Sequence, residues 1–330
     1  ISGNYSVKRI DLENGMLQVL TSSKNISNYN ILKTSSDSSD SHFKFEMEMF
    51  DVDKLDVLID LKPSSFTSKF LITDAQISGA FDENTYELGI ASELQFDNMQ
   101  ASGTKWISDL PIDLDCKLLV NNEKKEYSFS KGKIKLSEMQ VSVAGQMNFA
   151  GENPYVDLKL GGENWDIRSV LSLLPEAYKK QIASYESDGD FYGNAHIHGD
   201  WSGSINPHVE AQFGIQGGTI EHKENDIKMQ DVALKGTFSN GSRNAMQTSV
   251  LSLTEAQFNI EGGKAEGVMM LSNFNDLAIH ADFNAGLQLE DVFKFFPAGK
   301  VEQVQGRGNL DVVIDGKIGE LLDSKGSVAN

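Results

Sequence analysis

The sequence is poor in the residues that mark several common protein classes. Cys116 is its one cysteine, so no disulfide can form within the chain and no CxxC metal or redox motif is present. Proline is scarce, at 6 of 330 residues, and no run of about 18 apolar residues occurs, which argues against a membrane-spanning helix. The single cysteine leaves the compartment open, because a periplasmic protein can also lack disulfides.

Basic residues are also in short supply. Lysine and arginine number 29 against 48 aspartate and glutamate residues, which gives a net charge of −19. This charge argues against nucleic acid as a partner, since a phosphate backbone needs a basic surface, and against adhesion to anionic lipid through basic residues. The hydrophobic share of 39% is somewhat below the globular average and fits a thin or open shape with much surface for its core.

Alternation of apolar and polar residues with a period of two dominates what is present. Over residues 86–97 the even positions are mostly apolar and the odd positions mostly polar, and the same pattern recurs over 112–120, 139–149, 209–215 and 277–289. This pattern predicts β-strands with one apolar and one wet face. Ten to thirteen residues at ~3.4 Å each would span on the order of 35–40 Å. Short turn-like links between them favour an antiparallel meander.

One passage occurs twice, about 120 residues apart. The copies begin at 136–141 (LSEMQV) and 253–258 (LTEAQF), an offset of 253 − 136 = 117. Each copy continues through a glycine, an alternating strand, a Leu-Pro or Phe-Pro step and a second glycine, Gly189 or Gly306. Such a repeat predicts a chain that extends by stacking similar units rather than closing around one pocket. The units expected are approximately 43–187 and 188–330.

Two short amphipathic helices are expected to interrupt the strands. Each has apolar residues at positions i, i+3, i+4 and i+7, namely Ile167, Val170, Leu171 and Leu174, then Leu289, Val292, Phe293 and Phe296. Asp166 and Asp291 stand where a helix start favours an acid. Each helix should lie against the sheet edge or cap a unit. Residues 34–41 are serine- and aspartate-rich and predict a mobile polar loop.

Two motifs suggest metal sites, and both have a plainer explanation. His196 and His198 would share one face of a strand, with His208 or Glu210 as the remaining candidate ligand. Asp188 and Asp190 resemble the opening of a calcium loop, but tyrosine and glycine stand where that loop requires acidic ligands. We therefore favour solvated strand faces and expect no metal or cofactor.

Catalytic patterns are weak in this sequence. Acid pairs such as Asp113/Asp115 and Asp51/Asp53 would suit a carbohydrate-active enzyme only if two carboxylates converged at about 5–10 Å in a cleft. Alternation instead places them on the wet face of a strand. The sequence contains no G-x-S-x-G elbow, P-loop or HExxH motif. We predict a protein that is not an enzyme and has no catalytic residues.

The apolar strand faces are the candidate functional surface. If a second sheet covers them, they are the core of a sandwich and do nothing else. If the sheet is open, they form an apolar trough larger than a soluble monomer normally exposes. The residues expected to line it are Leu88, Ile90, Leu94, Phe96, Met139, Val141, Val143, Met147, Phe149, Phe213, Ile215, Phe258, Ile260, Ile279, Phe283 and Leu287.

The ordered set of strand patterns resembles the AsmA-like family. The resemblance rests on the spacing of 10–15 with 28–31, on 70–74, 79–81 and 86–97, and on 172–175 with Gly189 and Gly199. An echo follows at 295–297 with Gly306 and Gly316. These segments cover nearly the whole chain. The family, with TamB and its relatives, belongs to the bacterial bridge-like lipid-transfer proteins.

The resemblance implies a mostly β fold, an elongated antiparallel repeating β-groove made of a folded-over, taco-like sheet, with the two short helices. It implies that phospholipid acyl chains are shielded in the groove between the inner and outer membranes during outer-membrane biogenesis. It also implies a periplasmic location in a Gram-negative bacterium, anchorage to the inner membrane through an N-terminal helix, and outer-membrane proteins as further partners. The chain from Ile1 to Asn330 lacks that helix, so we expect a fragment of a longer protein. No charged pocket for a headgroup is evident, so lipid specificity should be low. A structural or assembly scaffold without lipid conduction is the alternative.

Overall fold

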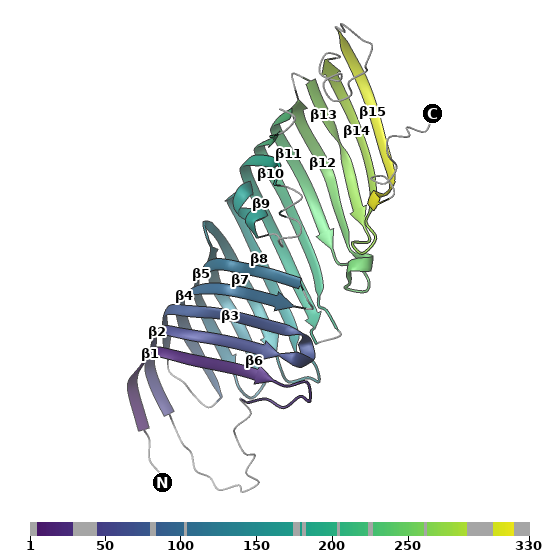
Figure 1. Ribbon diagram of the computed structural model, residues 1–330. Helices are drawn as coiled ribbons and strands as arrows, with labels where there is room; N and C mark the ends of the chain where they lie inside the picture. The colour runs from purple at the N-terminus through teal and green to yellow at the C-terminus, as the bar shows by residue number, and fades with distance from the viewer. Residues whose placement is uncertain are drawn as a thin grey trace. The chain divides into compact units, whose positions relative to one another are not determined.

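One β-sheet dominates the structure. In this computed structural model, the residues described are 5–28, 45–79, 84–101, 104–173, 179, 183–202, 205–223, 227–260, 263–288 and 306–319. All the strands among them belong to a single fifteen-stranded sheet in which each strand is hydrogen-bonded to its neighbours in chain order (Figure 1). The prediction of a mostly β fold is confirmed. The expected polar loop at 34–41 lies outside the described residues.

The strands are as long as, or longer than, the alternation predicts, with 10 to 18 residues each. The first eight are β1 (Tyr5–Thr21), β2 (Phe45–Leu61), β3 (Phe66–Gly79), β4 (Thr85–Ala101), β5 (Thr104–Asn121), β6 (Glu126–Leu136), β7 (Met139–Asn148) and β8 (Tyr155–Asp166). The others are β9 (Tyr185–Asp200), β10 (His208–His222), β11 (Ile227–Ser239), β12 (Val250–Ile260), β13 (Gly263–Ser272), β14 (Ala278–Gln288) and β15 (Arg307–Lys317). Short 3-10 turns occur at η1 (Lys62–Ser64) and η2 (Met246–Thr248).

The expected antiparallel meander is correct for most of the sheet and wrong for its first pair. Strands β2 to β7 and β10 to β15 pair antiparallel with their neighbours. In contrast, β1 runs parallel to β2, with Leu12 opposite Val52 and Leu17 opposite Val57. A parallel pair needs a connection of about a dozen residues or more, and residues 22–44 supply that length.

The chain divides into two compact units, which we describe separately. The first unit comprises residues 1–160, 173–177 and 197–207, and the second comprises 161–172, 178–196 and 208–330. Each unit has a small core: Val52, Leu55, Val57 and Ala75 form the first, and Ile167, Ile215 and Val232 form the second. Further buried apolar residues, among them Leu88, Cys116, Val141 and Ala281, are spread over the other strands, and most of the remaining apolar side chains on the described strands are half-buried.

Left-handed residues bend the first two strands at matching places. Asn14 and Lys54 have φ of 51° and 58° within β1 and β2. The strands stay paired on both sides of this step, with Glu13 opposite Asp53 and Gly15 opposite Leu55. A left-handed residue in a strand adds a residue that breaks the period of two and increases the local bend. Consequently Val52 and Leu55, three residues apart, share one face.

Two glycines of the sequence repeat adopt corresponding backbone conformations. Gly189 and Gly306 have φ of 131° and 136°, and they are 306 − 189 = 117 residues apart, the offset of the repeat. A φ in this region is rare for residues with a Cβ, so these positions favour glycine. The two copies of the repeat therefore share a backbone conformation at these glycines as well as a sequence pattern.

Helix is almost absent from the described residues. The first predicted helix is the six-residue α1 (Ile167–Ser172), and Leu174 lies outside the described residues. Asp166 begins it as expected, because its Oδ1 accepts a hydrogen bond from the backbone N–H of Arg168 at 2.7 Å. The second predicted helix, from Leu289 to Phe296, lies outside the described residues.

Candidate functional site

In the first unit, the register aligns apolar side chains into rows that cross the strands. Residues opposite each other in paired strands point to the same face of a sheet, and successive residues point to opposite faces. One such row runs through Leu12, Val52, Ala75, Ser92, Leu114, Ile134 and Val141. The next runs through Gly15, Leu55, Ile72, Leu94, Ile112, Leu136 and Met139. We call the side carrying these rows the apolar face.

The second unit has the same arrangement from β10 to β15. Its longest row runs through Ile215, Leu234, Ala256, Gly267, Phe283 and Val312. A neighbouring row runs through Gly236, Leu253, Met269, Ala281 and Ile314. Both lie on one face because their members alternate with polar residues along each strand. Each unit therefore carries an apolar face several strands wide.

The register places the predicted trough residues on these faces. In the first unit the set on β4 and β7 shares one face: Leu88, Ile90, Leu94, Phe96, Met139, Val141, Val143 and Met147. In the second unit Phe213, Ile215, Phe258, Ile260, Ile279 and Phe283 share the other apolar face. Phe149 lies just past β7, is 42% exposed and packs edge-on against Tyr127 at 5.6 Å. The backbone of Leu287 pairs with that of Gly308.

These residues differ in burial. Met139, Val141, Val143, Leu88 and Ile215 are buried, at 4 to 9% exposure. The other predicted trough residues whose side chains the structure describes are half-buried, except Phe149, which is exposed. No second sheet of other strands lies over either apolar face among the described residues, because every described strand belongs to the one sheet.

Sequence reasoning missed several contributors to the apolar face. The core of β2, with Val52, Leu55 and Val57, fails a strict test of alternation because Lys54 interrupts it. Asn14 and Gly15 could have indicated an irregularity in the first strand pair, since such residues within a strand are typical of bulges. Trp165 and Phe191 were also missed, although their rings stack on the neighbouring strands.

Aromatic rings in the second unit lie against glycines on the apolar face. Trp165 and Phe191 stack with centroids 6.1 Å apart, and Phe191 and Phe213 stack at 5.9 Å. Gly236 lies opposite Phe213, and a Cβ there would come 2.6 Å from Cε2 of that ring. Because glycine leaves this space open, the Phe213 ring occupies it. The sequence alternation predicts the ring's face but not this packing.

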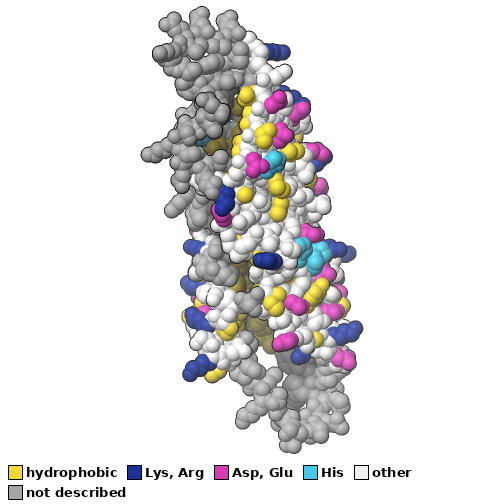
Figure 2. Space-filling view, turned by 90° about the vertical axis from the view of Figure 1, so that its right-hand side faces the viewer, with side chains coloured by type: hydrophobic (Ala, Val, Ile, Leu, Met, Phe, Trp, Pro, Cys, Tyr) yellow, Lys and Arg dark blue, Asp and Glu magenta, His cyan; other side chains and the backbone are white. Residues whose placement is uncertain are grey.

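The opposite face of each unit is polar. In the first unit Glu13, Asp53, Asp74, Glu93 and Asp113 form a row across β1 to β5. In the second unit the Lys235 ammonium lies 2.9 Å from Glu255, and His280 lies 2.9 Å from Asp315. Charged side chains project from the surface in Figure 2, where apolar side chains are also visible inside a hollow. The acid pairs considered for catalysis thus belong to a wet face.

Few ionisable groups are perturbed, and each has a local cause. Burial raises the pKa of the Cys116 thiol, which keeps it protonated on the apolar face. The Arg168 side chain lowers the pKa of Asp166 through a hydrogen bond, against the opposing effect of burial. The Lys223 ammonium, 2.9 Å from Glu186, likewise lowers the pKa of that carboxyl.

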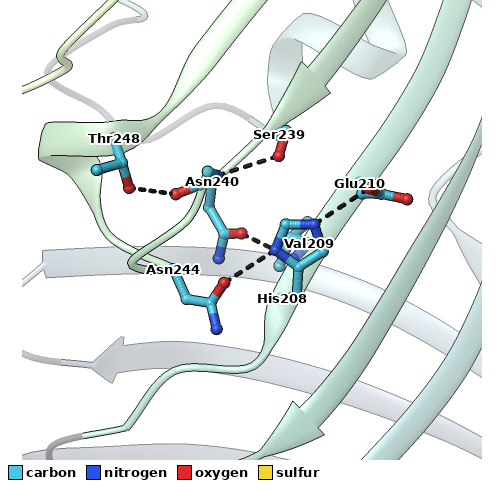
Figure 3. A network of polar contacts seen from close by, with 8 residues as sticks. His208, Val209, Glu210, Ser239, Asn240, Asn244 and Thr248 are labelled. Carbon is cyan, nitrogen blue, oxygen red and sulfur yellow. Dashed lines mark hydrogen bonds and ion pairs between the residues drawn. The ribbon is translucent and has the colours of Figure 1, made fainter.

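A polar network closes the turn between β11 and β12 (Figure 3). The ring of His208 lies 2.9 Å from Asn244 through Nδ1 and 3.1 Å from Glu210 through Nε2. Asn240 Oδ1 accepts a hydrogen bond from the backbone N–H of Val209, and Thr248 Oγ1 donates to the Asn240 carbonyl. The hydrogen bond to Asn244 raises the pKa of His208, and Glu210 raises it further. His208 therefore contributes to the hydrogen-bond network that holds the turn between β11 and β12.

The metal prediction can be examined on the part of the chain that the structure describes. There, no three or more His, Cys, Asp or Glu side chains gather closely enough to hold a metal ion. His196 and His198 both lie on β9 and both have interaction partners.

Comparison with known proteins finds no relative. No family model, curated protein sequence or solved structure matches the chain. Among the described residues, no helix has the length and apolar character needed to cross a membrane.

Proposed function

We propose that the apolar face binds lipid acyl chains and that the protein is a non-enzymatic lipid-binding and transfer module. The observation that carries this proposal is the set of apolar rows, several strands wide, in which some members such as Val52 and Met139 are buried and the others are half-buried or exposed, while every described strand belongs to one sheet. An apolar surface of that extent is uncommon on a soluble protein without a ligand or partner.

The sheet is proposed to curve into a groove with the apolar face inside. The matched left-handed residues Asn14 and Lys54 support a bend toward one side in the first unit, as do the register shifts around Thr73 in β3. In the second unit, register shifts occur in β10, β11 and β12 at neighbouring positions. Aligned bulges bend a sheet along one line.

Acyl chains suit such a surface for a physical reason. Burial of hydrocarbon contributes roughly 0.8 kcal/mol per CH₂ and requires no particular orientation. A chain can therefore shift along the rows while exchanging similar contacts. A carboxylate placed on the face would oppose this, because a charge loses hydration without gaining a partner.

The experiment uses two neighbouring methionines on opposite faces of β13. Met269 is half-buried on the apolar face, opposite Leu253 and Ala281, while Met270 is 42% exposed on the polar face, opposite Ser252 and His280. We expect Met269→Glu to abolish lipid that co-purifies with the protein, as measured by mass spectrometry of organic extracts. Met270→Glu adds the same charge on the same strand and should retain the lipid.

Two results would speak against the proposal. One is an absence of lipid from the unmodified protein, which would favour a structural or assembly scaffold. The other is equal lipid content in both variants, with circular dichroism showing that both are folded.

The wider biological setting is part of the same proposal. We propose that this is an AsmA-like protein that acts in the periplasm of a Gram-negative bacterium. An N-terminal helix would anchor it to the inner membrane, and it would transfer phospholipid toward the outer membrane. The support is the ordered strand spacing and the glycine echo at Gly189 and Gly306. Fractionation of the native host, with the protein found in the inner-membrane fraction and accessible from the periplasm, tests this setting.

A further inference from the structure

A charged depression of 420 Å³ lies in the second unit, beside α1 and the adjoining ends of β9, β10 and β11. Its lining includes two cations, Arg168 and Lys228, and three carboxylates, Glu186, Asp188 and Glu221. The volume falls within the range of about 300–1,000 Å³ common for small-molecule sites. Alternation along the chain did not indicate this depression, because its charged residues come from the four elements α1, β9, β10 and β11.

Some of these charged groups have bonding capacity left. Arg168 uses Nε and Nη2 on Asp166, at 3.1 and 2.8 Å, which leaves Nη1. The Lys228 ammonium is 3.5 Å from Glu221, beyond good hydrogen-bond distance. Asp188 accepts the Gly189 N–H through Oδ1 at 2.8 Å, and its Oδ2 has no partner among the described residues. The depression therefore offers two cationic groups, Arg168 and Lys228, and the Asp188 Oδ2 carboxylate oxygen to a ligand.

The mixture of charges selects a class of ligand. A free phosphate would meet two cations and three carboxylates, so repulsion would offset the attraction. A simple cation would face Arg168 and Lys228. A group that carries both signs can place its phosphate near the cations and its ammonium near Asp188 Oδ2, which satisfies both sets.

A second depression in the same unit has a different composition. It measures 480 Å³ over β9 to β13 and is lined by Tyr192, Lys235 and Glu255, among others. Lys235 is the only cation of its lining residues, and its ammonium already lies 2.9 Å from Glu255. That depression therefore has one cation among its lining residues, where the charged depression has two.

The charged depression adjoins the apolar face through consecutive residues. Arg168 follows Ile167, which is 4% exposed in the core of the second unit. Lys228 precedes Met229, and Glu221 follows Ile220, and both apolar residues pack against that core. Strand alternation turns Glu221 and Lys228 to the side opposite Ile220 and Met229. Since β10 ends at His222 and β11 begins at Ile227, the depression lies near the end of this strand pair.

We propose that this depression binds the zwitterionic headgroup of a phospholipid, of the ethanolamine-phosphate class, whose acyl chains pass around the strand ends onto the apolar face. This inference rests on the proposed function and adds a headgroup preference to it. Asp188 holds the ammonium, and Arg168 with Lys228 holds the phosphate. Asp188 then has a role in lipid recognition in place of the calcium role considered from the sequence.

The test compares two lipids with identical acyl chains. Purified protein is incubated with vesicles containing equal amounts of a phosphoethanolamine lipid and a phosphoglycerol lipid, and the captured lipids are quantified by mass spectrometry. The unmodified protein should enrich the phosphoethanolamine lipid. Asp188→Asn should lower that preference about two- to fivefold, the scale of an exposed charge pair. Asp282→Asn, which removes an exposed charge from the polar face of β14, is the matched control.

The outcomes separate this inference from the proposed function. Equal capture of both lipids, unchanged by Asp188→Asn, would overturn the headgroup site while the acyl-binding face stands. Capture of neither lipid would remove both. Efficient competition by soluble glycerophosphoethanolamine, without any lipid preference, would assign the depression to a free zwitterion and overturn its role in lipid binding.

Discussion

At the scale of single residues, the packing of the second unit depends on where side chains are missing. Phe213 occupies the space over Gly236, between the stacked Phe191 ring and Leu253. A methyl group at Gly236 would meet the ends of two side chains and no backbone atom within the three nearest contacts. The ring, rather than the backbone, would have to move.

A double-mutant cycle tests this packing. Gly236→Ala should lower the free energy of unfolding by about 1–3 kcal/mol, as overpacking commonly does, and Phe213→Leu should relieve much of that loss. Urea denaturation of the two single variants and the double variant gives the coupling energy. Gly286→Ala is the control, because the nearest atom to its new Cβ would be Asn309 Oδ1 at 3.5 Å. Additive effects of the two substitutions would contradict the account.

His208 provides a prediction of pH dependence. Its pKa is raised in the folded state, mainly by the hydrogen bond to Asn244 and then by Glu210. A raised folded-state pKa means that the stabilisation is fully present below the ordinary value of about 6.5 and is lost as the pH rises through the folded-state value. His208→Ala should therefore cost more stability at pH 5.5 than at pH 8.5.

Proton NMR titration of His208 checks the cause. Glu210→Gln should lower the pKa of His208, because it removes the charge 3.1 Å from Nε2. Glu266→Gln, on β13, should leave it unchanged. An equal cost of His208→Ala at both pH values would show that the network acts through packing alone.

At the scale of elements, the left-handed residues set the bend of β1 and β2. Asn14 suits this conformation, because its short polar side chain tolerates a positive φ, whereas Lys54 adopts it with the usual penalty of a Cβ. Because these two residues lie at the same level of two paired strands, both strands bend at the same place.

Substitutions at Lys54 measure this effect. Lys54→Val should lower the free energy of unfolding by about 1–2 kcal/mol, because a β-branched residue is poorly accommodated at positive φ. Lys54→Gly should retain stability or raise it by up to about 1 kcal/mol. Lys133→Val, at an exposed position of β6, should change it by no more than about 0.5 kcal/mol. Chemical denaturation would refute the assignment if both valine variants behaved alike.

Regular strands were predictable from the sequence, and interrupted ones were not. In β4 and β7 an apolar residue at every second position fixes the face, so Ile90, Leu94 and Val141 could be placed correctly. In β2 the extra residue Lys54 changes the phase, and alternation alone assigns Leu55 to the wrong side. The parallel pairing of β1 with β2 depends on a long-range choice that no local pattern encodes.

The candidate surfaces differ in the same way. The apolar face follows from a local rule applied strand by strand, so most of its residues could be named in advance. The charged depression depends on Arg168, Asp188 and Lys228 meeting across strand ends. Such a meeting depends on the register of neighbouring strands, and each bulge between β10 and β11 shifts that register by one residue.

At the scale of the whole molecule, the proposed function requires that lipid lies on one side of the sheet, the apolar one, in both units. In each unit, one apolar residue on the apolar face can be compared with one exposed apolar residue on the polar face. Met147 and Phe283 lie on the apolar faces, while Leu119, 41% exposed, and Val313, 66% exposed, lie on the polar faces. These four residues allow the two sides to be compared without a change in side-chain character.

Site-specific photo-crosslinking in living cells, followed by mass spectrometry of the adducts, is the most direct measurement. A benzophenone amino acid at Met147 or Phe283 should capture lipid, and the same group at Leu119 or Val313 should not. Capture of lipid from all four positions alike, or from neither apolar-face position, would contradict the claim.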